Sequence, residues 1–193
     1  MRASCLLLAL SVALLCACPP DRDPGTSDDD DDDATAEACT GVEPLTEACI
    51  ELAPTYTFTL ADAAAGVEIP YTVVISADVP GVRSLPQDAG GCGQPDASGL
   101  SLFERLSGGD QGYCECDVGL CPSPDPAPSL LGAGTFDRTF SWTGLNWAGP
   151  SDTGNPMGAP FPPGQYTLLV NAIGTVDGAD YTVSASSTIT LIE

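Results

Sequence analysis

The stretch VEIPYTVVIS, residues 67–76, decides the fold class of this chain, because apolar side chains recur in it at every second position. Successive side chains of an extended strand point to opposite faces, so this alternation predicts a β-strand with one apolar face. The side chains expected on that face are Val67, Ile69, Tyr71, Val73 and Ile75.

Other stretches repeat this alternation and are rich in Thr, Val, Ile and aromatic residues, as strands are. They are TYTFTLAD (55–62), TFDRTFSW (135–142), QYTLLVNAIG (165–174) and YTVSASSTITLI (181–192). GLSLFERLSG (99–108) favours one more strand, although its centre would also fit one helical turn. The chain is therefore predicted to be all-β, with six or seven strands and no helix. Their length and spacing favour a β-sandwich over a closed barrel.

A long stretch, about residues 78–134, lies between the strands predicted near 67–77 and 135–143. It is rich in Gly and Pro and holds Cys92, Cys114, Cys116 and Cys121. A long irregular loop is unusual in a compact domain unless it is functional or cross-linked. We therefore expect a sandwich domain over residues 39–193 with a cysteine-rich insertion over about 78–134.

The first 17 residues resemble the leader of a bacterial lipoprotein. An uncharged run follows Arg2 and ends in Leu15-Cys16-Ala17-Cys18, which is similar to the lipobox of that family: Leu, two small residues, then Cys. The resemblance implies that Cys18 is alkylated with diacylglycerol and becomes the mature N-terminus, in a bacterial cell envelope and most simply in the outer membrane. The alternative is an ordinary secretory signal cut nearby. Residues 18–38 contain six consecutive aspartates and almost no apolar residue, which predicts a disordered acidic tether.

Composition narrows the function classes. The chain of 193 residues has 27 acidic residues, five basic ones and no histidine, for a formal net charge of −22. Such a charge disfavours nucleic acid, whose binding depends on cationic side chains, and it also disfavours adsorption to anionic lipid. We therefore expect membrane contact through acyl chains on Cys18 alone. The missing histidine removes the usual base of serine and cysteine nucleophiles.

Six cysteines remain outside the leader and the lipid site, an even number that predicts disulfides in an exported domain. Cys39 and Cys49 are the local pair. Cys114 and Cys116 would point the same way on an extended strand, so each is expected to pair with Cys92 or Cys121, and both of these pairings stay open. Four thiolates on a metal are the weaker alternative, because zinc sites more often show Cys-x2-Cys spacing.

The segment FSWTGLNW (140–147), followed by a loop and PFPPGQYTLLVNAIG (160–174), resembles bacterial immunoglobulin-like modules. It is similar to the small sandwich of flagellar hook-capping proteins and to the bacterial intracellular proteinase inhibitor family. The resemblance covers about 35 residues and implies an immunoglobulin-like sandwich. Trp142 is then expected in the core, and Tyr166 at a strand start is expected to form a tyrosine corner.

From these features we expect a non-catalytic binding or structural module without cofactor or metal, whose partner is a protein, a glycan or a cationic ligand. The alternative is an inhibitor-like module that acts through an exposed loop between Trp147 and Pro163. An enzyme using carboxylates ranks third, because the single Asp152-Thr153-Gly154 triplet is more typical of a turn than of an aspartic protease, which needs two. The expected working surface includes the part of the insertion from about residue 90 to 122, with acids that include Glu104. The candidate binding residues are Asp96, Asp110, Tyr113, Glu115, Asp117 and Trp147.

Overall fold

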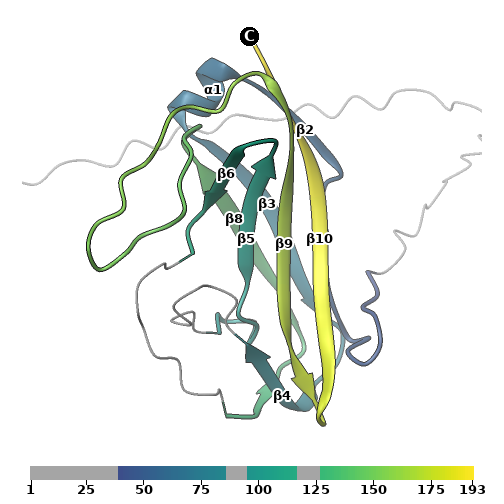
Figure 1. Cartoon of the computed structure of the whole chain (residues 1–193). Helices are drawn as coiled ribbons and strands as arrows, with labels where there is room; N and C mark the ends of the chain where they lie inside the picture. The colour runs from purple at the N-terminus through teal and green to yellow at the C-terminus, as the bar shows by residue number, and fades with distance from the viewer. Residues whose placement is uncertain (1–38, 86–94, 117–126) are drawn as a thin grey trace, which may run out of the picture. The chain divides into compact units, whose positions relative to one another are not determined.

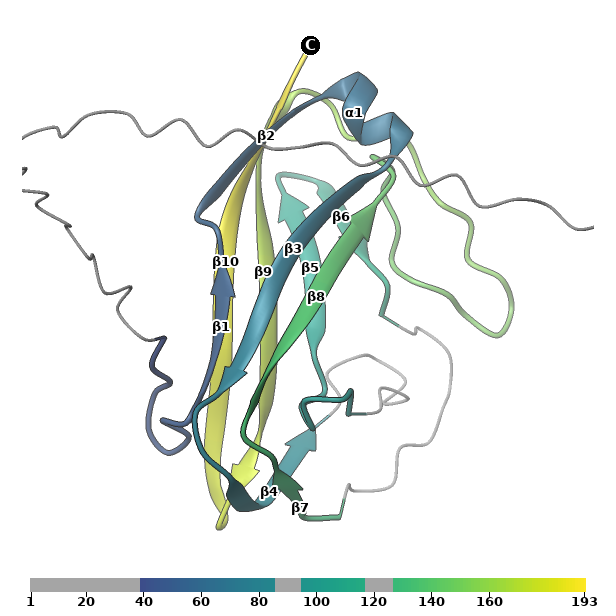
Figure 2. The ribbon, with the colours of Figure 1, turned by 180° about the vertical axis from the view of Figure 1, so that it is seen from behind.

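The computed structural model describes residues 39–85, 95–116 and 127–193. These residues form an all-β sandwich of two sheets (Figures 1 and 2). The smaller sheet has the strand order β1 (Ala48–Leu52), β3 (Val67–Ile75), β8 (Gly134–Trp142). The larger sheet runs β2 (Thr55–Thr59), β10 (Ala179–Ile192), β9 (Gly164–Val176), β4 (Val79–Leu85), β7 (Ser129–Leu131), and the hairpin of β5 (Phe103–Gly108) and β6 (Gln111–Cys114) joins it at β9. The described residues thus hold ten strands, more than the six or seven predicted.

The predicted strand faces are confirmed in the smaller sheet. Buried and exposed residues alternate along β3, and its apolar face packs inward from Val67 to Ile75. β8 pairs with β3 in an antiparallel register that places Phe140 beside Ile69 and Trp142 beside Val67. Both sheets contribute such faces to one core, because each buries its apolar side against the other.

The segment TYTFTLAD is only partly a strand. β2 ends at Thr59, and a helix, α1 (Leu60–Ala65), follows it. The Thr59 side chain accepts a hydrogen bond from the Asp62 backbone, and the Asp62 carboxylate accepts one from the Thr59 backbone. This reciprocal capping box satisfies two backbone donors and starts the helix, so the expectation of a strand through Asp62 and of no helix was wrong.

Within the described residues, the structure contains no helix with the length and apolar character needed to span a membrane.

The segment 78–134, expected to be largely irregular, supplies four strands. β9 is long enough to pair along one edge with two of them: β5 opposite residues 167–171 and β4 opposite residues 173–176. The strand predicted within GLSLFERLSG is confirmed as β5. An irregular course was therefore the wrong expectation for β4, β6 and β7, because short strands can be held by a neighbouring strand without strong alternation of their own.

A chain of aromatic rings runs through the core. Tyr166 contacts Phe161 with ring centroids 4.8 Å apart, and Phe161 contacts Trp142 at the same distance. Trp142 is only 1 % exposed, as predicted. The Tyr166 hydroxyl donates to the carbonyl of Pro162 at 2.6 Å, which confirms the tyrosine corner.

Candidate functional site

A cleft of about 520 Å³ lies between the β5–β6 hairpin and the loop that joins β8 to β9. We call it the hairpin cleft, and we call residues 143–163 the β8–β9 loop. In Figure 1 this loop extends beside β6. The volume of the cleft falls within the usual range of small-ligand sites, about 300–1,000 Å³. Side chains from both walls line the cleft. The hairpin contributes Phe103, Arg105 and Asp110, and the loop contributes Asn146, Trp147 and Pro156.

The first arm of the β8–β9 loop continues the sheet beyond β6. The backbone N–H of Cys114 donates to the carbonyl of Trp147, and the N–H of Trp147 donates to the carbonyl of Gly112, both at 3.0 Å. These bonds make Tyr113 and Trp147 partners in a parallel bridge. The wall of the cleft is therefore fixed to the hairpin by backbone pairing.

Two asparagines hold the arms of the loop together. The Asn146 amide donates to Gln111 Oε1 and to the Ala159 carbonyl, and its oxygen accepts from the Gly112 backbone. Asn155 donates its side-chain amide to the Gly149 carbonyl at 2.5 Å. All these bonds are made within the protein, so the loop is ordered before any ligand arrives and the entropic cost of binding is reduced.

Trp147 is anchored at the border between the core and the cleft. Its ring lies 6.1 Å from that of Tyr113, which packs on Phe140 and Trp142 and so joins the aromatic chain of the core. The Trp147 indole N–H donates to the Asn155 carbonyl at 2.7 Å. The ring is half-buried, so part of its apolar surface is available in the cleft.

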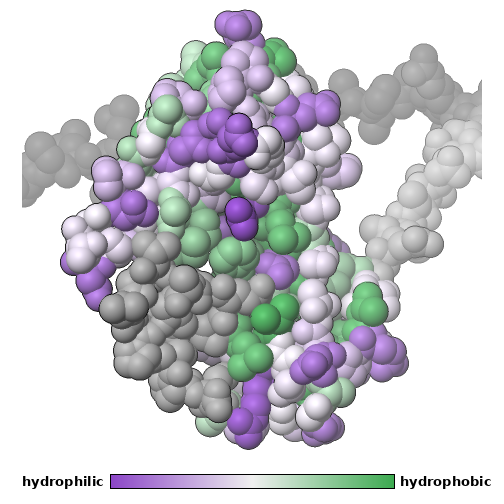
Figure 3. Space-filling view, viewed as in Figure 1, coloured by the Kyte–Doolittle hydropathy of each residue, from purple (hydrophilic) through white to green (hydrophobic). Residues whose placement is uncertain are grey.

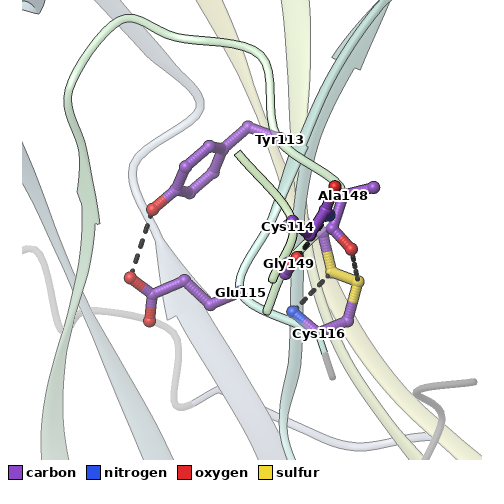
Figure 4. Close-up of a disulfide and its surroundings, with 7 residues drawn as sticks. Tyr113, Cys114, Glu115, Cys116, Ala148 and Gly149 are labelled. Atoms are coloured by element: carbon purple, nitrogen blue, oxygen red, sulfur yellow. Dashed lines mark hydrogen bonds between the residues drawn. A yellow bond between two sulfur atoms is a disulfide. The ribbon is translucent and has the colours of Figure 1, made fainter. Parts of the chain in front are cut away.

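The end of β6 carries a disulfide that was predicted otherwise. Cys114 is bonded to Cys116, with Cα atoms 5.1 Å apart (Figure 4). The expectation that each would pair with Cys92 or Cys121 was wrong because it assumed an extended chain, whereas β6 ends at Cys114. Cys92 and Cys121 lie outside the described residues. The Cys39–Cys49 disulfide is confirmed.

Gly149 lets the loop approach this disulfide closely. Its φ is +86°, and a Cβ added to it would lie 1.5 Å from the carbonyl oxygen of Cys116. The Cys116 sulfur is 3.6 Å from the Ala148 carbonyl (Figure 4). No side chain other than hydrogen fits at position 149 without displacement of the loop from the disulfide.

Two charged side chains in the cleft have no partner among the described residues. Arg105 and Asp110 are both exposed, and neither makes a side-chain hydrogen bond or ion pair within the described part of the chain. Arg138 is different, because its Nε donates to Asp96 Oδ2 at 2.6 Å. The described lining of the cleft thus offers a cationic donor group and an anionic acceptor group beside aromatic surface.

The other acids of the insertion that the structure describes are used within the fold. Asp96 accepts hydrogen bonds from Ser98 as well as from Arg138. Glu115 accepts the hydroxyl of Tyr113 at 3.1 Å (Figure 4). Among the described residues, no group of three or more Cys, Asp or Glu side chains is placed to hold a metal ion.

Glu104 accepts the hydroxyl of Tyr71 at 2.5 Å, between the two sheets. Burial raises the pKa of the Glu104 carboxyl above its ordinary value, and the nearby carboxylate of Glu115 adds to this, while the Tyr71 hydrogen bond opposes it. Burial also raises the pKa of Tyr71 and of Tyr113, so both hydroxyls stay protonated and donate to their carboxylates.

Of the residues predicted to bind, the structure brings Asp110, Tyr113 and Trp147 to the hairpin cleft. Tyr113 is only 3 % exposed and so supports the wall from within. Asp96 and Glu115 do not line the cleft, and Asp117 lies outside the described residues.

Sequence reasoning missed Phe103, Arg105 and Asn146. The rarity of basic residues, five in the whole chain, was the available signal for Arg105.

The Asp152-Thr153-Gly154 triplet is part of a turn, in which the Gly154 N–H donates to the Ser151 carbonyl.

No family model matches this sequence, and no curated protein matches it significantly.

Proposed function

We propose that this protein is a lipid-anchored lipoprotein of the bacterial cell envelope, whose sandwich domain is a non-catalytic binding module with its site in the hairpin cleft. The observation that carries the binding role is that Arg105 and Asp110, unpaired among the described residues, lie beside the half-buried Trp147 on walls fixed by internal hydrogen bonds. Preformed concave sites with a few convergent polar groups are where proteins usually bind small ligands.

The anchoring part of the proposal rests on the sequence. The Leu15-to-Cys18 motif and the acidic segment after it have the order of anchor and spacer, with the lipid at Cys18 and the domain held off the bilayer. The membrane contact would then be the acyl chains, because the acidic chain offers little attraction to anionic lipid. In this arrangement the domain would work as an exported binding or structural module.

A second function is favoured by the β8–β9 loop itself. Its arms are joined by internal hydrogen bonds, and Met157 near its end is 45 % exposed. A rigid loop with an exposed apolar side chain is the kind of segment that a proteinase inhibitor presents. The resemblance of residues 140–174 to the bacterial proteinase inhibitor family supports this alternative. The same resemblance supports the proposal that the sandwich is immunoglobulin-like.

The anchor is tested by expressing the full chain in a bacterium with a labelled fatty acid. The wild type should carry the label and remain in the membrane fraction, and Cys18→Ser should lose both, whereas Cys16→Ala should keep them. An unmodified Cys18 in the mature wild-type protein would contradict the lipoprotein assignment.

The binding role is tested by cross-linking the full chain in its native membrane and identifying what it retains. A double variant, Arg105→Gln with Asp110→Asn, should lose a ligand that a control, Arg83→Gln with Asp180→Asn, keeps. Stoichiometric inhibition of a serine proteinase, lost in Met157→Asp and kept in the cleft variant, would instead favour the inhibitor function.

A further inference from the structure

We propose that the hairpin cleft binds a neutral saccharide, with Trp147 as the stacking surface, Arg105 as the hydrogen-bond donor and Asp110 as the acceptor. This inference rests on the binding function proposed above and names the ligand class of that site. It is carried by the chemistry of the cleft groups that have no partner in the described part of the chain, and by the charge of the whole chain.

Arg105 and Asp110 together match the hydroxyls of a sugar. A guanidinium has five N–H donors in a planar fork and no acceptor, whereas a carboxylate has only acceptors. Each sugar hydroxyl can donate and accept, so hydroxyls of one saccharide can serve both the donor Arg105 and the acceptor Asp110. Both groups are exposed and without a described partner, so a ligand need not break an existing ion pair to reach them.

The apolar surface beside them suits the C–H face of a pyranose ring. Trp147 presents part of an indole that its own hydrogen bond and the Tyr113 ring hold in place. Phe103 and Pro156 add apolar lining on either wall. Because the indole N–H is already used on Asn155, the ring offers its surface rather than a polar contact, which is the mode of stacking on a sugar.

The register of β5 extends this surface across the sheet. Arg105 lies opposite Leu169 of β9, and Phe103 lies opposite Asn171. Figure 3 shows apolar side chains gathered over the region of β5 and β9. A charged group set among apolar ones gives orientation to a ligand that is mostly held by contact area.

Charge disfavours the other ligand classes. An acidic polymer would approach a chain of net charge −22 against long-range repulsion, even though Arg105 offers a local partner. A cationic peptide would be attracted to the protein at long range but would meet the Arg105 guanidinium inside the cleft. A neutral polar ligand with both donors and acceptors avoids both conflicts.

The probe is an array of neutral oligosaccharides built from hexose and N-acetylhexosamine units, together with acidic saccharides and cationic peptides. The full chain in detergent should bind at least one neutral oligosaccharide, with a change in tryptophan emission. Its affinity should change little between about 0.05 and about 0.5 M salt, because no ion pair with the ligand forms. Arg105→Gln and Asp110→Asn should each weaken that binding about tenfold or more, since a hydrogen bond to a charged group is lost.

The matched control is Arg83→Gln. Arg83 is also exposed and unpaired among the described residues, but it lies on β4 outside the hairpin cleft. It should leave saccharide binding unchanged. Thermal unfolding of each variant separates lost binding from lost folding, and Trp147→Phe, which keeps a ring but loses the indole, gives a second variant that should bind more weakly.

The outcomes separate this inference from the proposed function. No neutral saccharide bound by the folded chain would overturn the saccharide assignment. Binding of an acidic saccharide or a cationic peptide that the cleft variants abolish would overturn the ligand class but leave the binding function in place. Saccharide binding that Arg105→Gln and Asp110→Asn do not alter would overturn the site itself.

Discussion

Gly149 gives the most discriminating test of how the hairpin cleft is built. Its positive φ and the Cys116 carbonyl, 1.5 Å from an added Cβ, make Gly149→Ala both strained and sterically blocked. Gly154 in the same loop also has a positive φ, +79°, but an added Cβ would meet nothing within 4 Å. The pair therefore separates backbone strain from the close approach of the loop to the disulfide.

The expected magnitudes follow from these contacts. Gly154→Ala should lower the free energy of unfolding by about 1 kcal/mol, the usual cost of a left-handed conformation for a residue with a Cβ. Gly149→Ala should cost the same strain and should also break the two backbone hydrogen bonds that join Trp147 to β6. At about 1 kcal/mol for each of these bonds, the total becomes about 3 kcal/mol.

The assay is urea unfolding of both variants followed by tryptophan fluorescence. Trp142 is buried in the core and Trp147 lies at the cleft, so a displaced loop should also change the emission of the folded Gly149→Ala protein. The Gly154→Ala protein should keep the wild-type spectrum. Equal destabilisation of the two variants, or an unchanged spectrum for Gly149→Ala, would refute the close approach.

Three further predictions concern single contacts. Glu104→Gln should be more stable than the wild type at pH 7, as measured by thermal unfolding. The pKa of Glu104 is raised in the folded protein, so wild-type stability falls as pH rises from the ordinary glutamate pKa toward the raised one. A glutamine does not titrate and still accepts the hydrogen bond from Tyr71. The difference should vanish below about pH 4, and a difference that persists there would contradict this account. Tyr166→Phe should lose about 1 kcal/mol in urea unfolding, because it removes one hydrogen bond of the tyrosine corner and keeps the ring; an unchanged stability would show that the hydroxyl contributes nothing. Replacing Cys39 and Cys49 by Ser should lower the free energy of unfolding by about 2–4 kcal/mol, since the bridge restrains the unfolded chain. A reducing agent should then destabilise the wild type more than this double variant, and equal destabilisation of the two proteins would contradict the contribution of the bridge.

The features that the sequence determined are local ones. The inward faces of β3 and β8 follow from alternation, because a strand assigns successive side chains to opposite faces whatever its partner. The tyrosine corner spans only Pro162 to Tyr166, and the Cys39–Cys49 bridge spans ten residues. The Thr59–Asp62 capping box was equally local, and this signal for α1 was readable in the sequence although the strand pattern was extended through it.

The hairpin cleft was decided by the tertiary structure alone. Arg105 and Trp147 are 42 residues apart, and they share a cleft only because the β8–β9 loop pairs with β6. Whether Arg105 forms an ion pair depends on where the acidic side chains lie in the folded protein, and the spacing of residues along the sequence does not reveal this. The Cys114–Cys116 bond depends in the same way on where β6 ends. Alternation fixes a face from neighbours along the chain, whereas a site requires the distances between segments that only the packed sheets set.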